Sequence, residues 1–220
     1  MLTPVRHHPW DVSPKEAIAI QEHLASYIDT SDTLGDCQSV AGIDVGLGED
    51  TAQAAVVVLT LPDLEIVERV RAQRPLTFPY VPGLLTFREA PVILDALARL
   101  EREPDALIFD GQGYAHPRRM GLATHVGLLL DHPTVGCAKS RLCGTHGEPG
   151  PWRGQYTWLR DEQEIIGAVV RTRTDVNPVF VSIGHRVSLQ HAVDLVLRCG
   201  GGYKLPEATR WAHRVASGTA

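Results

Sequence analysis

The first apolar pattern along the chain is that of an amphipathic helix. Ser13 is a typical N-cap residue, and a proline and then Glu16 follow it, which together predict a capping box. Apolar side chains then recur every three or four residues, at Ala17, Ile20, Leu24 and Ile28. This spacing predicts a helix over residues 14–28, and the polar residues that follow predict a linker ending at residue 36.

Three segments rich in β-branched residues follow the linker, at residues 39–45, 52–60 and 65–73. The third segment alternates apolar with charged side chains, which is typical of a strand with one face in water. Because only short connections separate the three segments, they are predicted to pair as an antiparallel meander.

The remainder of the chain alternates between helical and strand patterns. Helices are predicted at residues 90–102, 120–130, 188–199 and 207–217, strands at 106–109, 134–137, 165–172 and 178–183, and a Gly- and Pro-rich loop at 144–154. Three consecutive strands followed by this alternation predict an α/β fold, a mixed sheet with helices on both faces. A length of 220 residues fits a single domain. We expect residues 1–36, the N-terminal helix and linker, to be part of the same domain as residues 37–220.

The composition excludes several classes of protein. Hydrophobic residues make up 44% of the chain and charged residues 21%, which is typical of a globular domain and not of a disordered or collagen-like one. The longest apolar runs fall far short of the roughly 20 residues of a membrane span, and the first ten residues lack the apolar core of a signal peptide. We therefore expect no membrane partner and a cytoplasmic location. The four cysteines form no Cys-x-x-Cys pair, so we expect reduced, mostly buried thiols.

The charge is distributed unevenly along the chain. The net charge is −5, which by itself argues against a nucleic-acid partner. However, residues 1–50 hold two basic and nine acidic side chains, whereas residues 114–220 hold thirteen basic and eight acidic ones. Only this last part can attract a polyanion, and arginine, whose planar guanidinium suits phosphate oxygens, supplies most of its positive charge.

Two aspartates stand at the ends of strands that are otherwise suited to burial. Asp44 lies within the strand at 39–45, and Asp110 follows the apolar run at 106–109. Buried carboxylates are costly unless they are paired or bind a metal, and Mg²⁺ is commonly held by one or two of them. The pair therefore suggests a site for a hard cation. Taken singly, each also fits an ordinary role, a hydrogen-bonded strand end for Asp44 and an Asp-Gly turn for Asp110.

Glu89 allows two interpretations. Thr86 and Glu89 match a capping box, but Pro91 would then lie inside the helix and remove a hydrogen bond. A helix that begins near Ala90, with Pro91 at its first position, would instead leave Glu89 free at the helix mouth for catalysis.

The segment at residues 79–82 places an aromatic ring, Tyr80, between two prolines that stiffen the chain. A rigid projecting ring suits an enzyme that fills a gap in a base stack, although a surface loop is the commoner use of such a segment. Arg118 and Arg119 are adjacent guanidiniums suited to phosphate, but exposed arginine pairs are common. Taken alone, Lys139 fits a solvated surface lysine and His213 a hydrogen-bonded core histidine.

Together these residues resemble the endonuclease V family, the deoxyinosine 3′ endonucleases. The matching motifs occur in order after residue 36, as GIDV at 42–45, PYVPGLLTFRE at 79–89, DGQGYAHPRR at 110–119, GCAK at 136–139, VSIGHR at 181–186 and TRWAH at 209–213. Each motif alone is modest, whereas the series in this order is highly specific.

The resemblance implies a ribonuclease H-like fold and the activity of a DNA-repair endonuclease. Such an enzyme recognises deaminated bases in DNA, chiefly deoxyinosine. It hydrolyses the second phosphodiester bond on the 3′ side of the lesion, leaving 3′-hydroxyl and 5′-phosphate ends. The resemblance also implies Mg²⁺ as the cofactor, with Mn²⁺ as a substitute. We further expect a monomer.

The same resemblance assigns roles to matching positions of this chain. The catalytic residues would be Asp44, Glu89, Asp110, Lys139 and His213, of which Asp44, Asp110 and Glu89 would be metal ligands. Lys139 would steady the scissile phosphate, and His213 would stand near the metal. The wedge and DNA-contacting residues would be Pro79, Tyr80, Val81, Pro82, Arg118 and Arg119. The pocket for the damaged base would be lined by Gly83, Leu85, Gly111, His116, Gly121 and Leu122.

Three alternative functions stay open. An endonuclease for inosine-containing RNA would share every motif. A metal-dependent phosphohydrolase of small nucleotides would share the carboxylates but would give Tyr80 no role. A noncatalytic nucleic-acid-binding module would need the three carboxylates to be structural, and incubation of inosine-containing DNA with and without Mg²⁺ separates it from an enzyme.

Overall fold

The N-terminal helix forms where the sequence predicts it. The structure, a computed structural model, describes residues 2–219. Helix α1 spans Pro14–Ala25, and both hydrogen bonds of the predicted capping box between Ser13 and Glu16 are present. The helix ends at Ala25 rather than at residue 28, because Ser26 already serves as its C-cap.

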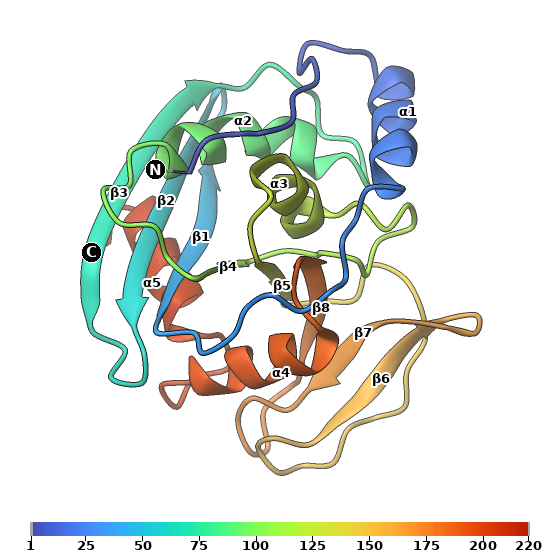
Figure 1. Cartoon of the computed structure of the whole chain (residues 1–220), viewed down its shortest axis with the longest axis vertical. Helices are drawn as coiled ribbons and strands as arrows, with labels where there is room; N and C mark the ends of the chain where they lie inside the picture. The colour runs from blue at the N-terminus through green and yellow to red at the C-terminus, as the bar shows by residue number, and fades with distance from the viewer. Residues whose placement is uncertain (1, 220) are drawn as a thin grey trace.

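One mixed sheet of eight strands forms the centre of the molecule, in the order β3-β2-β1-β4-β5-β8-β7-β6 (Figure 1). The strands are β1 Ser39–Leu47, β2 Thr51–Thr60, β3 Ile66–Pro75, β4 Ala106–Phe109, β5 Thr134–Ala138, β6 Tyr156–Asp161, β7 Glu164–Val170 and β8 Val179–His185. β1, β2 and β3 pair antiparallel, which confirms the predicted meander. β1, β4 and β5 are parallel neighbours, and β8, β7 and β6 extend the sheet in antiparallel fashion.

Helices cover both faces of this sheet. They are α2 Leu85–Leu97, α3 Leu122–Leu130, α4 Leu189–Arg198 and α5 Glu207–Ala216. Alternate residues of β2 face opposite layers, so Val56 belongs to the core layer that includes residues of α2 and α3, whereas Val57 belongs to the layer that includes residues of α4 and α5. The predicted α/β, ribonuclease H-like class, a single domain with a helix-flanked mixed sheet, is confirmed. No helix within residues 2–219 is long and apolar enough to cross a membrane.

The predicted start of the second helix is wrong. α2 begins at Leu85 rather than near Ala90, so Pro91 lies inside the helix and Glu89 is not at its mouth. The alternative capping box fails too, because Thr86 is a buried residue of the first turn and Leu84 is the N-cap. Leu84 and Phe87 are buried together against α1, and this tertiary packing outweighs the hydrogen bond that Pro91 removes.

Strand β6 is a second departure from the prediction, which placed no strand at residues 156–161. Tyr156 and Trp158 are favourable strand residues, but the segment is only partly buried and carries no regular alternation. It is held by antiparallel pairing with β7. Together they form the β6–β7 hairpin, whose tip is residues 161–164.

The four cysteines agree with the prediction of reduced, mostly buried thiols. All four are free, and Cys37, Cys137 and Cys199 are buried. Burial raises the pKa of Cys37 to about 11 and that of Cys199 to about 12, which disfavours the reactive thiolate form.

Helix α5 approaches the sheet closely at one glycine. A Cβ atom at Gly42 would lie 2.0 Å from the carbonyl carbon of Ala208 and 2.4 Å from the backbone nitrogen of Thr209. Only a residue without a side chain allows this distance, so Gly42 sets how near α5 lies to β1.

Candidate active site

Asp44 and Asp110 emerge at the same edge of the sheet. β1 and β4 are parallel, and Ile43 is paired with Phe109. Asp44, the next residue of β1, therefore lies beside Asp110, the first residue after β4. Glu89 reaches this edge from α2, where it is buried. The three carboxylates, with Lys139, line one cavity of about 220 Å³, which we call the carboxylate cavity.

The electrostatics of the carboxylate cavity favour a cation. Burial raises the pKa of Glu89 to about 8, and the negative charges of Asp44 and Asp110 contribute to the rise. Burial also raises the pKa of Asp110, although Lys139 opposes this shift. Among residues 2–219, three carboxylates and only one positive side chain, Lys139, line the cavity. Hard divalent cations prefer such oxygen ligands, so these residues fit the metal that the sequence predicts.

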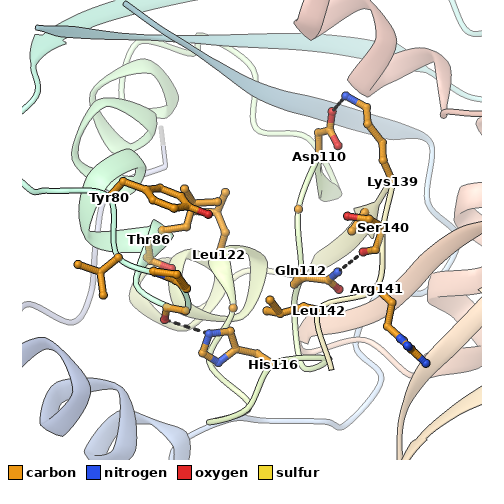
Figure 2. Close-up of a pocket in the computed structure, with 17 residues that line it drawn as sticks. Tyr80, Thr86, Asp110, Gln112, His116, Leu122, Lys139, Ser140, Arg141 and Leu142 are labelled. Atoms are coloured by element: carbon orange, nitrogen blue, oxygen red, sulfur yellow. Dashed lines mark hydrogen bonds and ion pairs between the residues drawn. The ribbon is translucent and has the colours of Figure 1, made fainter. Parts of the chain in front are cut away.

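Two of these carboxylates are engaged by side chains in the structure. Lys139 Nζ lies 2.5 Å from Asp110 Oδ2 (Figure 2), and His213 Nδ1 lies 3.0 Å from Asp44 Oδ2. Across residues 2–219, no three Asp, Glu, His or Cys side chains are already arranged to hold a metal ion.

The ordinary interpretations of Lys139 and His213 do not describe their surroundings. His213 is not a core residue, because its side chain is 58% exposed and contacts Asp44. Lys139 is half-exposed, but its amine is paired with Asp110 rather than only with solvent. The structure thus brings all five predicted catalytic residues to one edge of the sheet.

A second cavity of about 370 Å³ adjoins the first, and we call it the base pocket. Its wall includes all six residues predicted for this role: Gly83, Leu85, Gly111, His116, Gly121 and Leu122. Tyr80, Val81 and Pro82 of the predicted wedge also line it, and Tyr80 is 70% exposed. Figure 2 shows Tyr80 and Thr86 on one side of the pocket, facing Gln112, Ser140 and Leu142 on the other.

The two cavities share part of their walls. Leu85, Asp110, Leu122 and Lys139 border both. A group held in the base pocket therefore lies next to the carboxylates.

His116 is a neutral hydrogen-bonding group of the pocket wall. Burial lowers its pKa to about 4, and the charges of Arg118 and Arg119 add to this effect. Its Nε2 lies 3.0 Å from the Gly83 carbonyl oxygen, as the dashed line from His116 in Figure 2 marks. At neutral pH the ring therefore donates one hydrogen bond and carries no charge.

Arg118 and Arg119 are engaged in contacts within the protein. Arg118 donates to the Gly83 carbonyl and to Gln21 Oε1, at 2.8 and 2.7 Å. Arg119 pairs with Asp161 and Glu164 at the tip of the β6–β7 hairpin, at 2.8 and 2.7 Å. Neither residue lines the base pocket. Their predicted contact with DNA stays a prediction, and the structure adds that both fix loops next to the pocket.

Several pocket residues were not predicted. They are Thr86, Gln112, Ala138, Ser140, Arg141 and Leu142. Thr86 and Gln112 lie within motifs that the sequence already singles out, and Gln112 donates to the Ser140 carbonyl at 2.8 Å (Figure 2). The loop after Lys139 has no distinctive residue pattern. Its nearness to Lys139 in the chain is the one sequence feature that could have indicated it.

The fold and site define a nuclease, a hydrolase whose carboxylates lie at the edge of a ribonuclease H-like sheet. The model of the Endonuclease V family matches residues 22–214. The chain belongs to the Endonuclease V family, whose members are endonucleases that act on DNA and generally depend on a divalent metal ion.

Relatives and solved structures agree with this assignment. Endonuclease V of Roseiflexus sp. (strain RS-1) is 54% identical over 209 residues, which cover 95% of this chain and 94% of that protein. The crystal structure of Endonuclease V from Streptomyces avermitilis is 40% identical, with a TM-score of 0.90 over 98% of this chain and 96% of that one. Ciona intestinalis Endonuclease V, solved with DNA that contains an inosine followed by a ribo-adenosine, is 27% identical, with a TM-score of 0.81 over 93% and 96% of the two chains.

Proposed function

We propose that this protein is a DNA-repair endonuclease that recognises deaminated bases, chiefly deoxyinosine, and cuts the DNA backbone on their 3′ side. The shared wall of the base pocket and the carboxylate cavity carries this proposal. A base turned out of the helix into the pocket would bring the DNA backbone next to Asp110 and Lys139. The inosine-containing DNA bound by the Ciona relative supports the same substrate.

Asp44, Asp110 and Glu89 would hold the divalent cation, which we propose is Mg²⁺ with Mn²⁺ as a substitute. When bound, such a cation lowers the pKa of an attacking water and neutralises charge on the leaving oxygen. Burial, together with the charges of Asp44 and Asp110, raises the pKa of Glu89, and a bound cation would favour its charged form, so Glu89 would lose its proton there.

Lys139 would bind the scissile phosphate, and His213 would hold Asp44. Once free of Asp110, the Lys139 amine can donate hydrogen bonds to the scissile phosphate. His213, at 3.0 Å from Asp44, would orient that carboxylate while its exposed edge faces the DNA. The bond cut would be the second phosphodiester 3′ to the lesion.

Base recognition would combine the pocket with the wedge. Gly83, Leu85, Gly111, His116, Gly121 and Leu122 would enclose the turned-out base, while residues 79–82 would fill the gap that it leaves. Arg118 and Arg119 would support this arrangement through the loops that they fix. The division of the chain at residue 36, the cytoplasmic location and the monomeric state stay predictions from the sequence.

The test of this function is digestion of a duplex with a single deoxyinosine, with and without Mg²⁺. We expect cleavage only with the cation, at the second bond 3′ to inosine, with 3′-hydroxyl and 5′-phosphate ends and the base still attached. Asp44 and Glu89 line the carboxylate cavity and not the base pocket, and Asp110 stands where the two cavities meet, so we expect the three carboxylates to address a phosphate and not the glycosidic bond. Mass spectrometry of the products identifies the broken bond.

Free hypoxanthine, an abasic product or a 3′-phosphate end would contradict this mechanism. An inosine-containing RNA and a free inosine nucleotide serve as parallel substrates. Faster cleavage of the RNA would favour the RNA endonuclease, and hydrolysis of the free nucleotide would favour the small-nucleotide phosphohydrolase.

Replacing Tyr80 with alanine is expected to reduce the preference for inosine-containing DNA about tenfold or more, since stacking of an aromatic ring on a base contributes about 1 to 3 kcal/mol. Affinity for undamaged duplex rests on phosphate contacts and should change little. Fluorescence anisotropy with both duplexes at one salt concentration measures the preference. Leu47→Ala, another exposed apolar residue outside the pocket, is the control. Equal losses on both duplexes would show that Tyr80 is only a surface residue.

A further inference from the structure

A buried glutamine of the N-terminal helix is bonded to both loops that border the base pocket. Gln21, on α1, has no exposed surface. Its Nε2 donates to the carbonyl oxygens of Gly83 and Met120, at 3.2 and 3.0 Å. Its Oε1 accepts from Arg118 Nε at 2.7 Å. Because a guanidinium only donates, these contacts fix the orientation of the amide, and both of its hydrogens are used.

The Gly83 carbonyl accepts two further side-chain hydrogen bonds. Arg118 Nη2 donates to it at 2.8 Å, and His116 Nε2 lies 3.0 Å away. The backbone N–H of Arg118 donates to His116 Nδ1 at 3.2 Å, so the proton of the neutral ring is on Nε2, which donates to Gly83. Three donors thus converge on one carbonyl oxygen and fix the direction of the peptide that follows Gly83.

Gly83 joins two parts of the proposed machinery. The wedge directly precedes it, and α2, which carries Glu89, begins at Leu85. Gly83 has a φ of +78°, in the left-handed region that favours glycine, so the chain turns sharply between the wedge and the helix. The direction of this one peptide therefore affects both the projection of Tyr80 and the start of α2.

From these contacts we infer that Gln21 is a positioning residue for damaged-base recognition. Its amide holds the loop before α2, through Gly83, at a fixed separation from the loop before α3, through Met120. The base pocket lies between these two loops. This role rests on the proposed function, because it concerns the pocket that would receive the turned-out base.

Two substitutions test the role of the amide. Gln21→Glu keeps the size of the side chain and the acceptor for Arg118, but as a carboxylate it cannot donate to the two carbonyls. Gln21→Leu removes all three hydrogen bonds. Both are expected to lower cleavage of an inosine-containing duplex about a hundredfold, as misplacement of a reacting group by about 1 Å does. Affinity for undamaged duplex is expected to stay at the wild-type value.

His132→Leu provides a matched control for general destabilisation. His132 is also buried, and its Nε2 bonds to the Pro104 carbonyl at 2.8 Å. It lies where β4 and β5 begin, whereas Asp110 and Lys139 lie where these strands end. This variant is expected to lower the melting temperature but to leave cleavage unchanged. Cleavage by the Gln21 variants is compared with cleavage by His132→Leu at a similar loss of melting temperature, which separates a positioning role from a general loss of stability. Gln21→Glu keeps the test valid if Gln21→Leu does not fold.

A second readout needs neither metal nor cleavage. A 2-aminopurine placed beside the inosine becomes more fluorescent when the base stack opens, so it reports wedge insertion directly. The wild-type protein is expected to raise this fluorescence, and the Gln21 variants are expected to lose the rise while still binding the duplex. A wild-type protein that neither cleaves nor raises the fluorescence would overturn the proposed function and this role with it. If either Gln21 variant cleaves and raises the fluorescence as the wild type does, the positioning role of the Gln21 amide is overturned, while the proposed function stands.

Discussion

Replacing Asp110 with asparagine is expected to reduce cleavage of an inosine-containing duplex about a thousandfold, while the protein stays folded. Asparagine keeps the shape of the side chain but has no charge with which to hold a hard cation. Transition-state stabilisation by the cation contributes several kcal/mol, and about 4 kcal/mol corresponds to a thousandfold in rate. Asp44→Asn is expected to have the same effect, because Asp44 lies in the same row of the sheet. Single-turnover cleavage in saturating Mg²⁺ measures the loss.

Asp95→Asn is the control for these two variants. Asp95 also belongs to an ion pair, with Arg74 Nε at 2.6 Å, but it lies in a surface contact outside both cavities. We expect this variant to cleave at the wild-type rate. Normal turnover by Asp44→Asn or Asp110→Asn would exclude the proposed metal ligands.

Replacing Gly42 with alanine is expected to lower the free energy of unfolding by about 3 kcal/mol, at the upper end of the range for overpacked cores. The added methyl group would meet the backbone of α5 at Ala208, which cannot turn aside as a flexible side chain could. Relief of the clash requires α5 to move away from β1. This movement carries His213 away from Asp44, so cleavage should fall as well. Urea denaturation measures the stability, and cleavage below the unfolding transition measures activity.

Gly147→Ala is the matched glycine control, because a Cβ atom there meets nothing within 4 Å. We expect its stability and activity to equal those of the wild type. A Gly42→Ala protein with wild-type stability would mean that α5 lies farther from β1 than the structure has it.

The sheet and the two aspartates could be predicted because the information is local. Alternation of apolar and polar residues identifies individual strands, and a charged residue at the end of an apolar run stands out without knowledge of its neighbours. Asp44 and Asp110 are of this kind. The parallel pairing of β1 with β4, which sets them side by side, follows from the α/β arrangement and not from either segment alone.

The remaining features depend on contacts between distant segments. Pro91 indicates a helix start by local rules, but burial of Phe87 against α1 extends α2 by a full turn before it. Arg119 looks like a phosphate ligand until the β6–β7 hairpin brings Asp161 and Glu164 to it. Gln21 has no distinguishing pattern in the sequence, because its partners lie 62 and 99 residues away.

The two outer strands of the sheet have a consequence for behaviour at high concentration. An uncovered edge strand offers free backbone donors and acceptors to another chain, which promotes aggregation. β3, at one edge, has polar residues at the alternate exposed positions Arg69, Arg71 and Gln73 and ends at Pro75, which has no N–H to donate. β6, at the other edge, is partly covered where Thr145 bridges to Arg160. Strand addition between copies is therefore disfavoured at both edges, so the protein should resist sheet-mediated self-association when it is concentrated.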